Sequence, residues 1–135
     1  MAVLGKLTTL RSLNLETTPI SDAGLRHLAG LTNLEDLNLF LTPVGDQGLV
    51  HLKGLTKLKR LSLWMTNVTD AGLPHLAGLT NLETLDLAGT GITDAGLTHL
   101  RSLNHLRTLG LADTKVTEAG VRSLRKALPK VNVTR

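Results

Sequence analysis

The stretch GLTNLETLDLAGTGITDAGLTHLR, residues 78–101, recurs with changes along nearly the whole chain. Steps of 24 residues divide the sequence into the repeats 6–29, 30–53, 54–77, 78–101 and 102–125. Self-similarity at a fixed period of this length is typical of a solenoid, in which each repeat buries its apolar face only against its neighbours. The pattern therefore predicts one domain over residues 1–135, with a partial C-terminal cap strand in residues 126–135.

The first half of each repeat carries the pattern LxxLxxLxLxxT. In the second repeat Leu37 and Leu39 flank Asn38, and this alternation predicts a short strand with one buried face. Since every repeat runs in the same direction, we expect the strands to pair in parallel, about 4.8 Å apart.

The second half of each repeat predicts a short helix. In the second repeat Asp46 precedes Leu49 and Leu52 at steps of three, which is typical of a polar cap followed by an apolar stripe. An acidic residue recurs at this position, so each carboxylate is expected to cap its own helix: Asp22, Asp46, Asp70, Asp94 and Glu118. Pro74 lacks an N–H and disfavours a helical residue before it, so the third repeat should have the shortest or most 3₁₀-like helix.

These repeats resemble those of leucine-rich-repeat proteins over residues 6–133. The TDAGLxHL segments at 69–76 and 93–100 resemble repeats of F-box-associated and bacterial arrays. The resemblance implies an α/β fold, a right-handed solenoid with a parallel β-sheet on the concave face and short helices on the convex face. It also implies a non-catalytic protein-protein interaction module whose protein or peptide partner binds the concave strand face.

The chain departs from that family at the position after each strand, where Asn or Cys is usual. Threonine stands there instead, at Thr18, Thr42, Thr66, Thr90 and Thr114. A hydroxyl has only one proton to donate, so we expect a threonine ladder that ties the loops slightly less firmly than an asparagine ladder does.

Histidine also recurs once per repeat, at His27, His51, His75 and His99. A metal needs ligands that converge on one point, whereas these histidines lie a whole repeat apart and the chain has no cysteine. We interpret them as residues that pack between neighbouring helices. With the carboxylates assigned to caps and no phosphate-binding glycine motif present, the sequence predicts no enzyme, no cofactor and no metal.

The net charge of +4 is unevenly placed. Residues 101–135 hold eight Lys or Arg against two acidic residues, a net +6, which leaves −2 for residues 1–100. A basic end can contact nucleic acid, but no aromatic residue is interleaved for base stacking, so a solvated cap is the preferred interpretation. The chain has no apolar run of about 18 residues, and its first five residues lack the apolar stretch of a signal peptide. We therefore expect no membrane partner and a cytoplasmic location.

Differences between repeats concentrate on the predicted strands. Directly after the second leucine of the pattern LxxLxxLxLxxT, the sign of the charge alternates from one repeat to the next, through Arg11, Glu35, Lys59, Glu83 and Arg107. The next position continues the alternation with Asp36 and Arg60. Such a ladder is either a self-neutralised, solvated surface or a rim that a partner contacts.

The two aromatic residues of the chain, Phe40 and Trp64, occupy matching positions of adjacent repeats and are followed by Leu41 and Met65. Strand alternation places both rings on the solvent face. Aromatic and methionine side chains are what interface centres use, although the two rings could instead cover each other and neighbouring loops. The predicted partner-binding residues are Phe40, Leu41, Trp64, Met65, Asp36, Arg60, Asn38 and Ser62.

The N-terminal end supports a second hypothesis. Residues 3–7 match residues 27–31, so we expect the chain to start inside the tail of a preceding helix, as a fragment or a designed array would. Four leucines then lack a covering repeat: Leu7, Leu10, Leu13 and Leu15. Exposed leucines beside an open parallel edge favour pairing with another chain. The alternative function is therefore a structural or designed scaffold that forms a homo-oligomer through this end.

Overall fold

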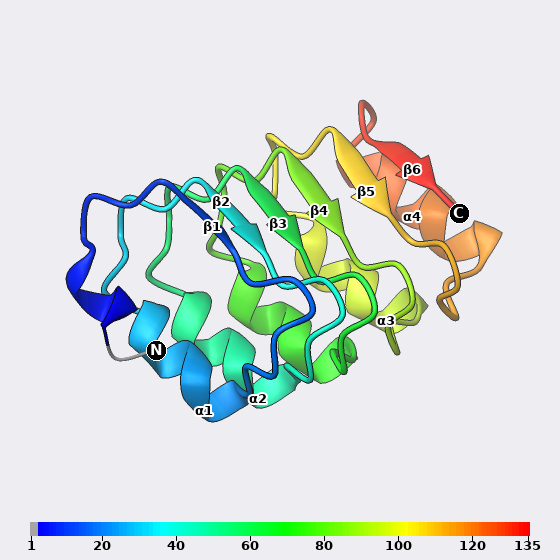
Figure 1. Ribbon diagram of the computed structural model, residues 1–135. Coiled ribbons are helices and arrows are strands. Elements are labelled where there is room, and N and C mark those ends of the chain that lie inside the picture. Colours follow the sequence, from blue (N-terminus) through cyan, green and yellow to red (C-terminus); the bar gives the residue numbers. More distant parts are fainter. Residues whose placement is uncertain (1–2) are drawn as a thin grey trace.

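The computed structural model of the protein describes residues 3–135 and contains one parallel sheet of six short strands in sequence order. The strands are β1 (Ser12–Asn14), β2 (Asp36–Asn38), β3 (Arg60–Ser62), β4 (Thr84–Asp86), β5 (Thr108–Gly110) and β6 (Asn132–Thr134). Leu37 pairs with Leu13 on one side and with Leu61 on the other, so the register advances by one 24-residue period per strand. The fold is the predicted right-handed α/β solenoid, with the sheet along one side and the helices along the other (Figure 1).

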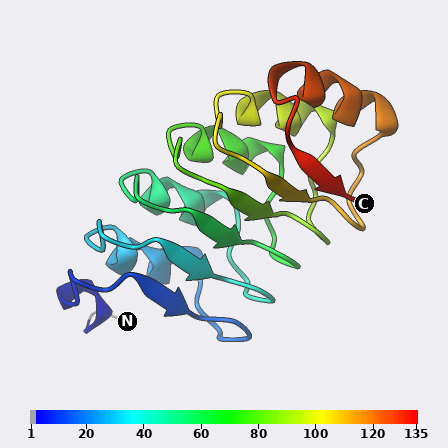
Figure 2. The same ribbon diagram turned by 90° about the horizontal axis from the view of Figure 1, so that it is seen from above.

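The helices are short and stand side by side behind the strands, as the view from above shows (Figure 2). A turn of α-helix continues as 3₁₀-helix in three repeats: α1 (Asp22–Leu25) with η2 (Arg26–Leu28), α2 (Asp46–Leu49) with η3 (Val50–Leu52), and α3 (Asp94–Leu97) with η5 (Thr98–Leu100). Two further elements close the ends, η1 (Leu4–Lys6) and the longer α4 (Glu118–Ala127).

The third repeat is the exception that Pro74 predicts. Its helix η4 (Asp70–Leu76) is 3₁₀ throughout and contains Pro74. It has the same length, seven residues, as the α-plus-3₁₀ helix before it, so the expectation of the shortest or most 3₁₀-like helix is confirmed by its 3₁₀ character. The missing N–H of proline removes a bond that a continuous α-helix would need.

The core is a stack of leucines, one layer per repeat. In the third repeat Leu55, Leu58, Leu61 and Leu63 are all buried, and Leu61 is only 1% exposed. At the N-terminal end Leu7 is exposed and Leu10 and Leu13 are half-buried, but Leu15 is buried, so the expectation that these four leucines lie uncovered is wrong for Leu15. The turn formed by η1 packs Leu4 against this end of the core.

The recurring threonines close a turn within their own repeats. Each hydroxyl donates to the carbonyl three residues earlier, as Thr66 does to Leu63 at 2.7 Å, and the same bond recurs at Thr18, Thr42, Thr90 and Thr114. The threonines are therefore individual turn locks, and these bonds do not join one repeat to the next.

The aspartates, in contrast, do join the repeats, which corrects the capping prediction. Asp46 is the first residue of its own helix, and its carboxylate accepts from the backbone N–H of Thr69 at 2.7 Å and from the Thr69 hydroxyl at 2.5 Å, in the following repeat. Thr69 is the residue that caps a helix, because its hydroxyl accepts from the N–H of Ala71. The pattern recurs between Asp70 and Thr93. The capping residue and the first helical residue are neighbours in the sequence. The repeat pattern predicts the acid at the capping position, whereas in the structure it is the first helical residue.

The recurring glycine two residues after each acid is explained by the same contact between repeats. A Cβ placed on Gly72 would lie 2.5 Å from the Asp46 carboxylate of the preceding repeat, and one on Gly96 would lie 2.2 Å from that of Asp70. Glycine therefore admits the acid that ties the two repeats together.

Candidate functional site

The solvent face of β1 to β4 forms an open hollow of about 410 Å³ on the concave side. Its polar lining comes from strand residues that point away from the leucine core: Asn14, Asp36, Asn38, Arg60, Ser62 and Asp86. The two edges of this face differ in chemistry. We call them the start edge, where the strands begin, and the end edge, where they end.

The start edge carries paired charges. Arg60 donates through Nε and one terminal nitrogen to the two carboxylate oxygens of Asp36, and Glu35 accepts from Lys59 at 3.0 Å and from Arg11 at 3.4 Å. The hydrogen bond and charge of Asp36 raise the pKa of Arg60, and those of Lys59 lower the pKa of Glu35. These pairs are solvent-exposed, so water and salt screen them and they contribute little to stability.

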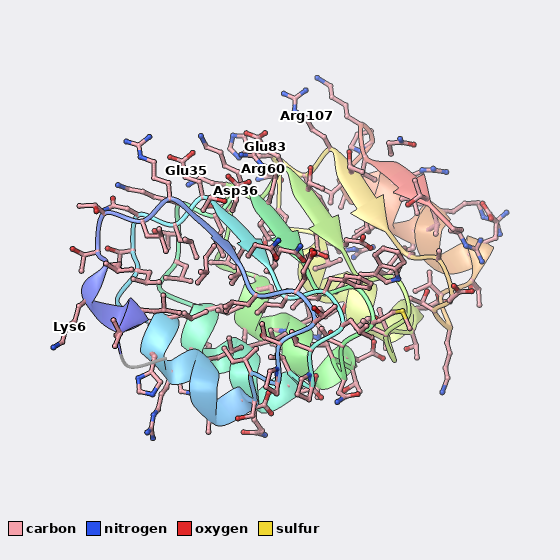
Figure 3. The ribbon with its side chains drawn as sticks, in the orientation of Figure 1. Lys6, Glu35, Asp36, Arg60, Glu83 and Arg107 are labelled. Atoms are coloured by element: carbon pink, nitrogen blue, oxygen red, sulfur yellow. The ribbon has the colours of Figure 1, made fainter. Side chains whose placement is uncertain are left out.

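Figure 3 shows a row of charged side chains along the strand starts, in which the sign alternates from one strand to the next: Glu35 and Asp36, Arg60, Glu83, and Arg107. Within residues 3–135 the ladder is only partly closed, because no ion pair involves Glu83 or Arg107. Where the row borders the hollow, opposite charges neutralise each other through the pairs of Glu35 and Asp36 with their cations.

The end edge carries the apolar side chains. Phe40 follows β2 and Trp64 follows β3, and their rings stack with centroids 4.4 Å apart and planes inclined by 24°. Phe40 is half-buried, whereas Trp64 remains 42% exposed. The rings thus cover each other, as one interpretation of the sequence had it, and Trp64 is accessible as well.

Leu41 and Met65 extend this surface from an unusual backbone conformation. Both have φ of +53°, and they are 47% and 49% exposed. The left-handed region costs a non-glycine residue about 1–2 kcal/mol, and Gly89 occupies the matching position of the fourth repeat. We call Phe40, Leu41, Trp64 and Met65 the apolar patch.

The structure places the eight predicted residues in two groups, the apolar patch on the end edge and the polar residues in the hollow beside it. Asn38 has a positioning role, since its side chain accepts from the N–H of Phe40 at 3.0 Å and donates to Glu16 at 2.7 Å. Sequence reasoning missed Asp86, which lines the same hollow. Its signal was available, because Asp86 is the one acid in a column that otherwise reads Asn14, Asn38, Ser62 and Gly110.

Other chemistry is not assembled in the part of the chain that the structure describes. Among residues 3–135 no three histidine, aspartate or glutamate side chains form a group that could hold a metal ion. His51 and its counterparts are half-buried along the helices. No helix within these residues is long and apolar enough to cross a membrane, and the cellular location stays a prediction.

Comparison with known proteins agrees with this architecture. The family described as leucine-rich repeats in two copies matches residues 56–99, and a single leucine-rich repeat matches residues 6–29 and 30–52. No curated protein matches the chain. Among solved structures, internalin C2 of Listeria monocytogenes is 32% identical with a TM-score of 0.79, and the comparison covers 99% of this chain and 56% of that one.

A second internalin of Listeria monocytogenes (inlF) is 26% identical with a TM-score of 0.84, and the comparison covers 98% of this chain and 36% of that one. This chain therefore spans about half the length of the first internalin and about a third of the second. The repeat pattern, the parallel solenoid and these matches together show that the chain belongs to the leucine-rich-repeat proteins.

Proposed function

We propose that this protein-interaction module binds a protein or peptide partner through the concave face, with the apolar patch at the centre of the contact. The observation that carries the proposal is the pair Leu41 and Met65, which are exposed and held at positive φ. Glycine or asparagine would suit that backbone better, so the fold itself gives no reason for large apolar side chains there. The same conformation recurs at Thr17, Gly89 and Asp113, so the left-handed turn belongs to the repeat, and what distinguishes these two positions is their exposed apolar side chains.

The neighbouring rings support the same proposal. Trp64 is the residue type most enriched at the centres of interfaces, and its stack on Phe40 holds it in one orientation before any partner arrives. A side chain that is already ordered loses less conformational entropy on binding, which favours affinity. The paired charges of the start edge then form a polar rim around the contact.

The size of the face sets the expected strength. Six strands about 4.8 Å apart give a surface roughly 25 Å long, close to the lower limit for a stable contact of about 800 Å² per partner. We therefore expect micromolar rather than nanomolar binding from this chain alone.

The test compares partner capture, by pull-down with chemical crosslinking, for the wild type and for the double variant Leu41→Gly/Met65→Gly. Glycine suits the backbone at both positions, so the side chains are removed without forcing the turns to rearrange. The matched control is Val50→Ala, which shortens an exposed apolar residue on the helical side. Partners retained by the wild type and by Val50→Ala but lost from the double variant support the proposal. Equal retention by all three proteins would refute it.

Trp64 gives an independent readout because it is the only tryptophan. A partner that covers the apolar patch should shift its emission to shorter wavelength, and Trp64→Ala should weaken binding by about 2 kcal/mol or more. Since Trp64 stacks on Phe40, the same substitution should also destabilise the fold, by about 0.5–1.5 kcal/mol for the lost ring pair and more for the buried area. The glycine double variant is therefore the cleaner binding test.

A further inference from the structure

From β1 to β5 the end edge of the concave face has a charge of one sign. The segments at these strand ends are residues 14–17, 38–41, 62–65, 86–89 and 110–113. Their charged residues are Glu16, Asp86 and Asp113, with no lysine, arginine or histidine. Beyond them, Arg135 follows β6 and pairs with Glu118 at 2.6 Å. The start edge is different, because its cations are largely paired with acids there.

Asp86 is the acid closest to the apolar patch that also faces the hollow. It lies beside Ser62 of β3 in the sheet register, two residues before the strand position opposite Trp64. One carboxylate oxygen accepts from the N–H of Ala88 at 3.0 Å. Among residues 3–135 neither an ion pair nor a further hydrogen bond engages the other oxygen, which leaves a free acceptor at the margin of the patch.

The fold does not need the charge of Asp86. The equivalent residues Asn14 and Asn38 make the same turn, accepting from the N–H two residues ahead at 3.0 Å through a neutral amide oxygen. An acid at this position adds a negative charge without adding a bond that asparagine lacks. The chain also leaves room for it, since a Cβ on the neighbouring Gly110 would lie 2.4 Å from the carboxylate.

We infer that the partner segment carries a lysine or arginine beside its apolar anchor, and that this cation binds at Asp86. The inference rests on the proposed function and specifies the chemistry of the partner. An exposed apolar surface flanked by Glu16 on one side and Asp86 on the other is complementary to an apolar side chain with a basic neighbour.

The strand spacing gives the spacing in the partner. The Phe40–Trp64 stack lies over β2 and β3, and Asp86 lies on β4, roughly 7 Å away across the strands and two residues, or about 6.6 Å, earlier along them. The direct separation is therefore on the order of 10 Å. An extended segment that crosses the strands advances about 3.3 Å per residue, and alternate residues point to the same side. Two positions cover about 6.6 Å, and the long side chain of a lysine or arginine covers the rest, so the cation is two positions from the anchor, in the pattern apolar-x-basic or its reverse.

The experiment pans a library of random displayed dodecapeptides against the wild type and sequences the bound pool. Lysine or arginine should be enriched two positions from a large apolar residue, and the selected peptides should shift the Trp64 emission. The affinity of the strongest peptide is then measured with Asp86→Asn, which keeps the oxygen that accepts from Ala88. We expect a loss of about tenfold, since a charge-assisted contact is removed. Glu83→Gln, an acid of the start edge, is the matched control and should change the affinity less than about twofold.

A cycle with a second peptide locates the contact. Replacing the basic residue of the peptide by glutamine should cost about tenfold on the wild type and little on Asp86→Asn, because both changes remove one interaction. Enriched peptides that lack a basic residue, or an unchanged affinity on Asp86→Asn, overturn the inference while the proposed function stands if Leu41→Gly/Met65→Gly abolishes their binding. If the enriched peptides bind Leu41→Gly/Met65→Gly as well as they bind the wild type, or if no peptide is enriched, both the inference and the proposed function are overturned.

Discussion

Met65 offers a direct test of the left-handed backbone in the turn after β3. The perturbation is a pair of substitutions, Met65→Ala and Met65→Gly, which remove the same side chain beyond the Cβ. At ordinary positions glycine is the less stable of the two by about 0.5–1 kcal/mol, because the unfolded chain gains more freedom. At φ of +53° the alanine variant retains the left-handed penalty of about 1–2 kcal/mol, and the glycine variant does not.

Subtracting the central values leaves Met65→Gly about 0.8 kcal/mol more stable than Met65→Ala. Urea denaturation at 25 °C measures the difference, provided that the dependence of the unfolding free energy on urea is equal in both variants. The control is the same pair at Ser62, in the extended backbone of β3, where alanine should be the more stable residue. If Met65→Ala equals or exceeds Met65→Gly in stability, the turn is not left-handed in solution, and the strain argument for the apolar patch fails with it.

Three further predictions concern the solenoid. Leu61→Ala should destabilise the protein by about 2–5 kcal/mol in chemical denaturation, and a cost below about 0.5 kcal/mol would contradict its place in the core. The bonds from Thr117 lower the pKa of Asp94, so they stabilise the fold above the unfolded pKa of about 3.9 and this contribution is lost as the pH falls through the folded value. Asp94→Asn should therefore show a smaller loss of unfolding free energy between pH values of about 6 and 3 than the wild type, and equal losses would count against the tie. Exposed Leu7 beside the free edge of β1 should produce a concentration-dependent dimer in sedimentation that Leu7→Lys abolishes, and a strict monomer at high concentration would exclude self-association through this end.

The repeat pattern predicts most of the fold because the sequence pattern of each strand and helix recurs in several repeats. The alternation around Leu37 and the three-residue steps after Asp46 place the strands and helices, and Pro74 correctly marks η4, whose seven residues are all 3₁₀ where the matching helices begin with a turn of α-helix. A prediction from several repeats is reliable where all of them show the same pattern. It is less reliable where two neighbouring positions could play the same role, as with Thr69 and Asp70 as the helix cap.

The candidate site is only partly readable from sequence for a related reason. The column of Phe40 and Trp64 is visible as a departure from the repeat, so the aromatic pair can be predicted. The positive φ of Leu41 and Met65 is not, because in a column that also holds Thr17 only Gly89 and Asp113 are residue types that favour this conformation. The charge of Asp86 gains meaning only when the structure shows that Asn14 and Asn38 make the same turn without it.

The tie between Asp46 and the following repeat makes the chain modular. At three junctions an acid of one repeat meets a threonine and a glycine of the next, as Asp46 meets Thr69 and Gly72, whereas Asp22, within residues 3–135, accepts only from the backbone N–H of Gly45. These three junctions are chemically the same, so a repeat of 24 residues between two of them can be duplicated or removed and the two surfaces that meet still match. Arrays of this chain can therefore change length by recombination between repeats without evolving a new interface. The concave face lengthens by one strand each time, so under the proposed function a weak contact becomes a stronger one by duplication alone.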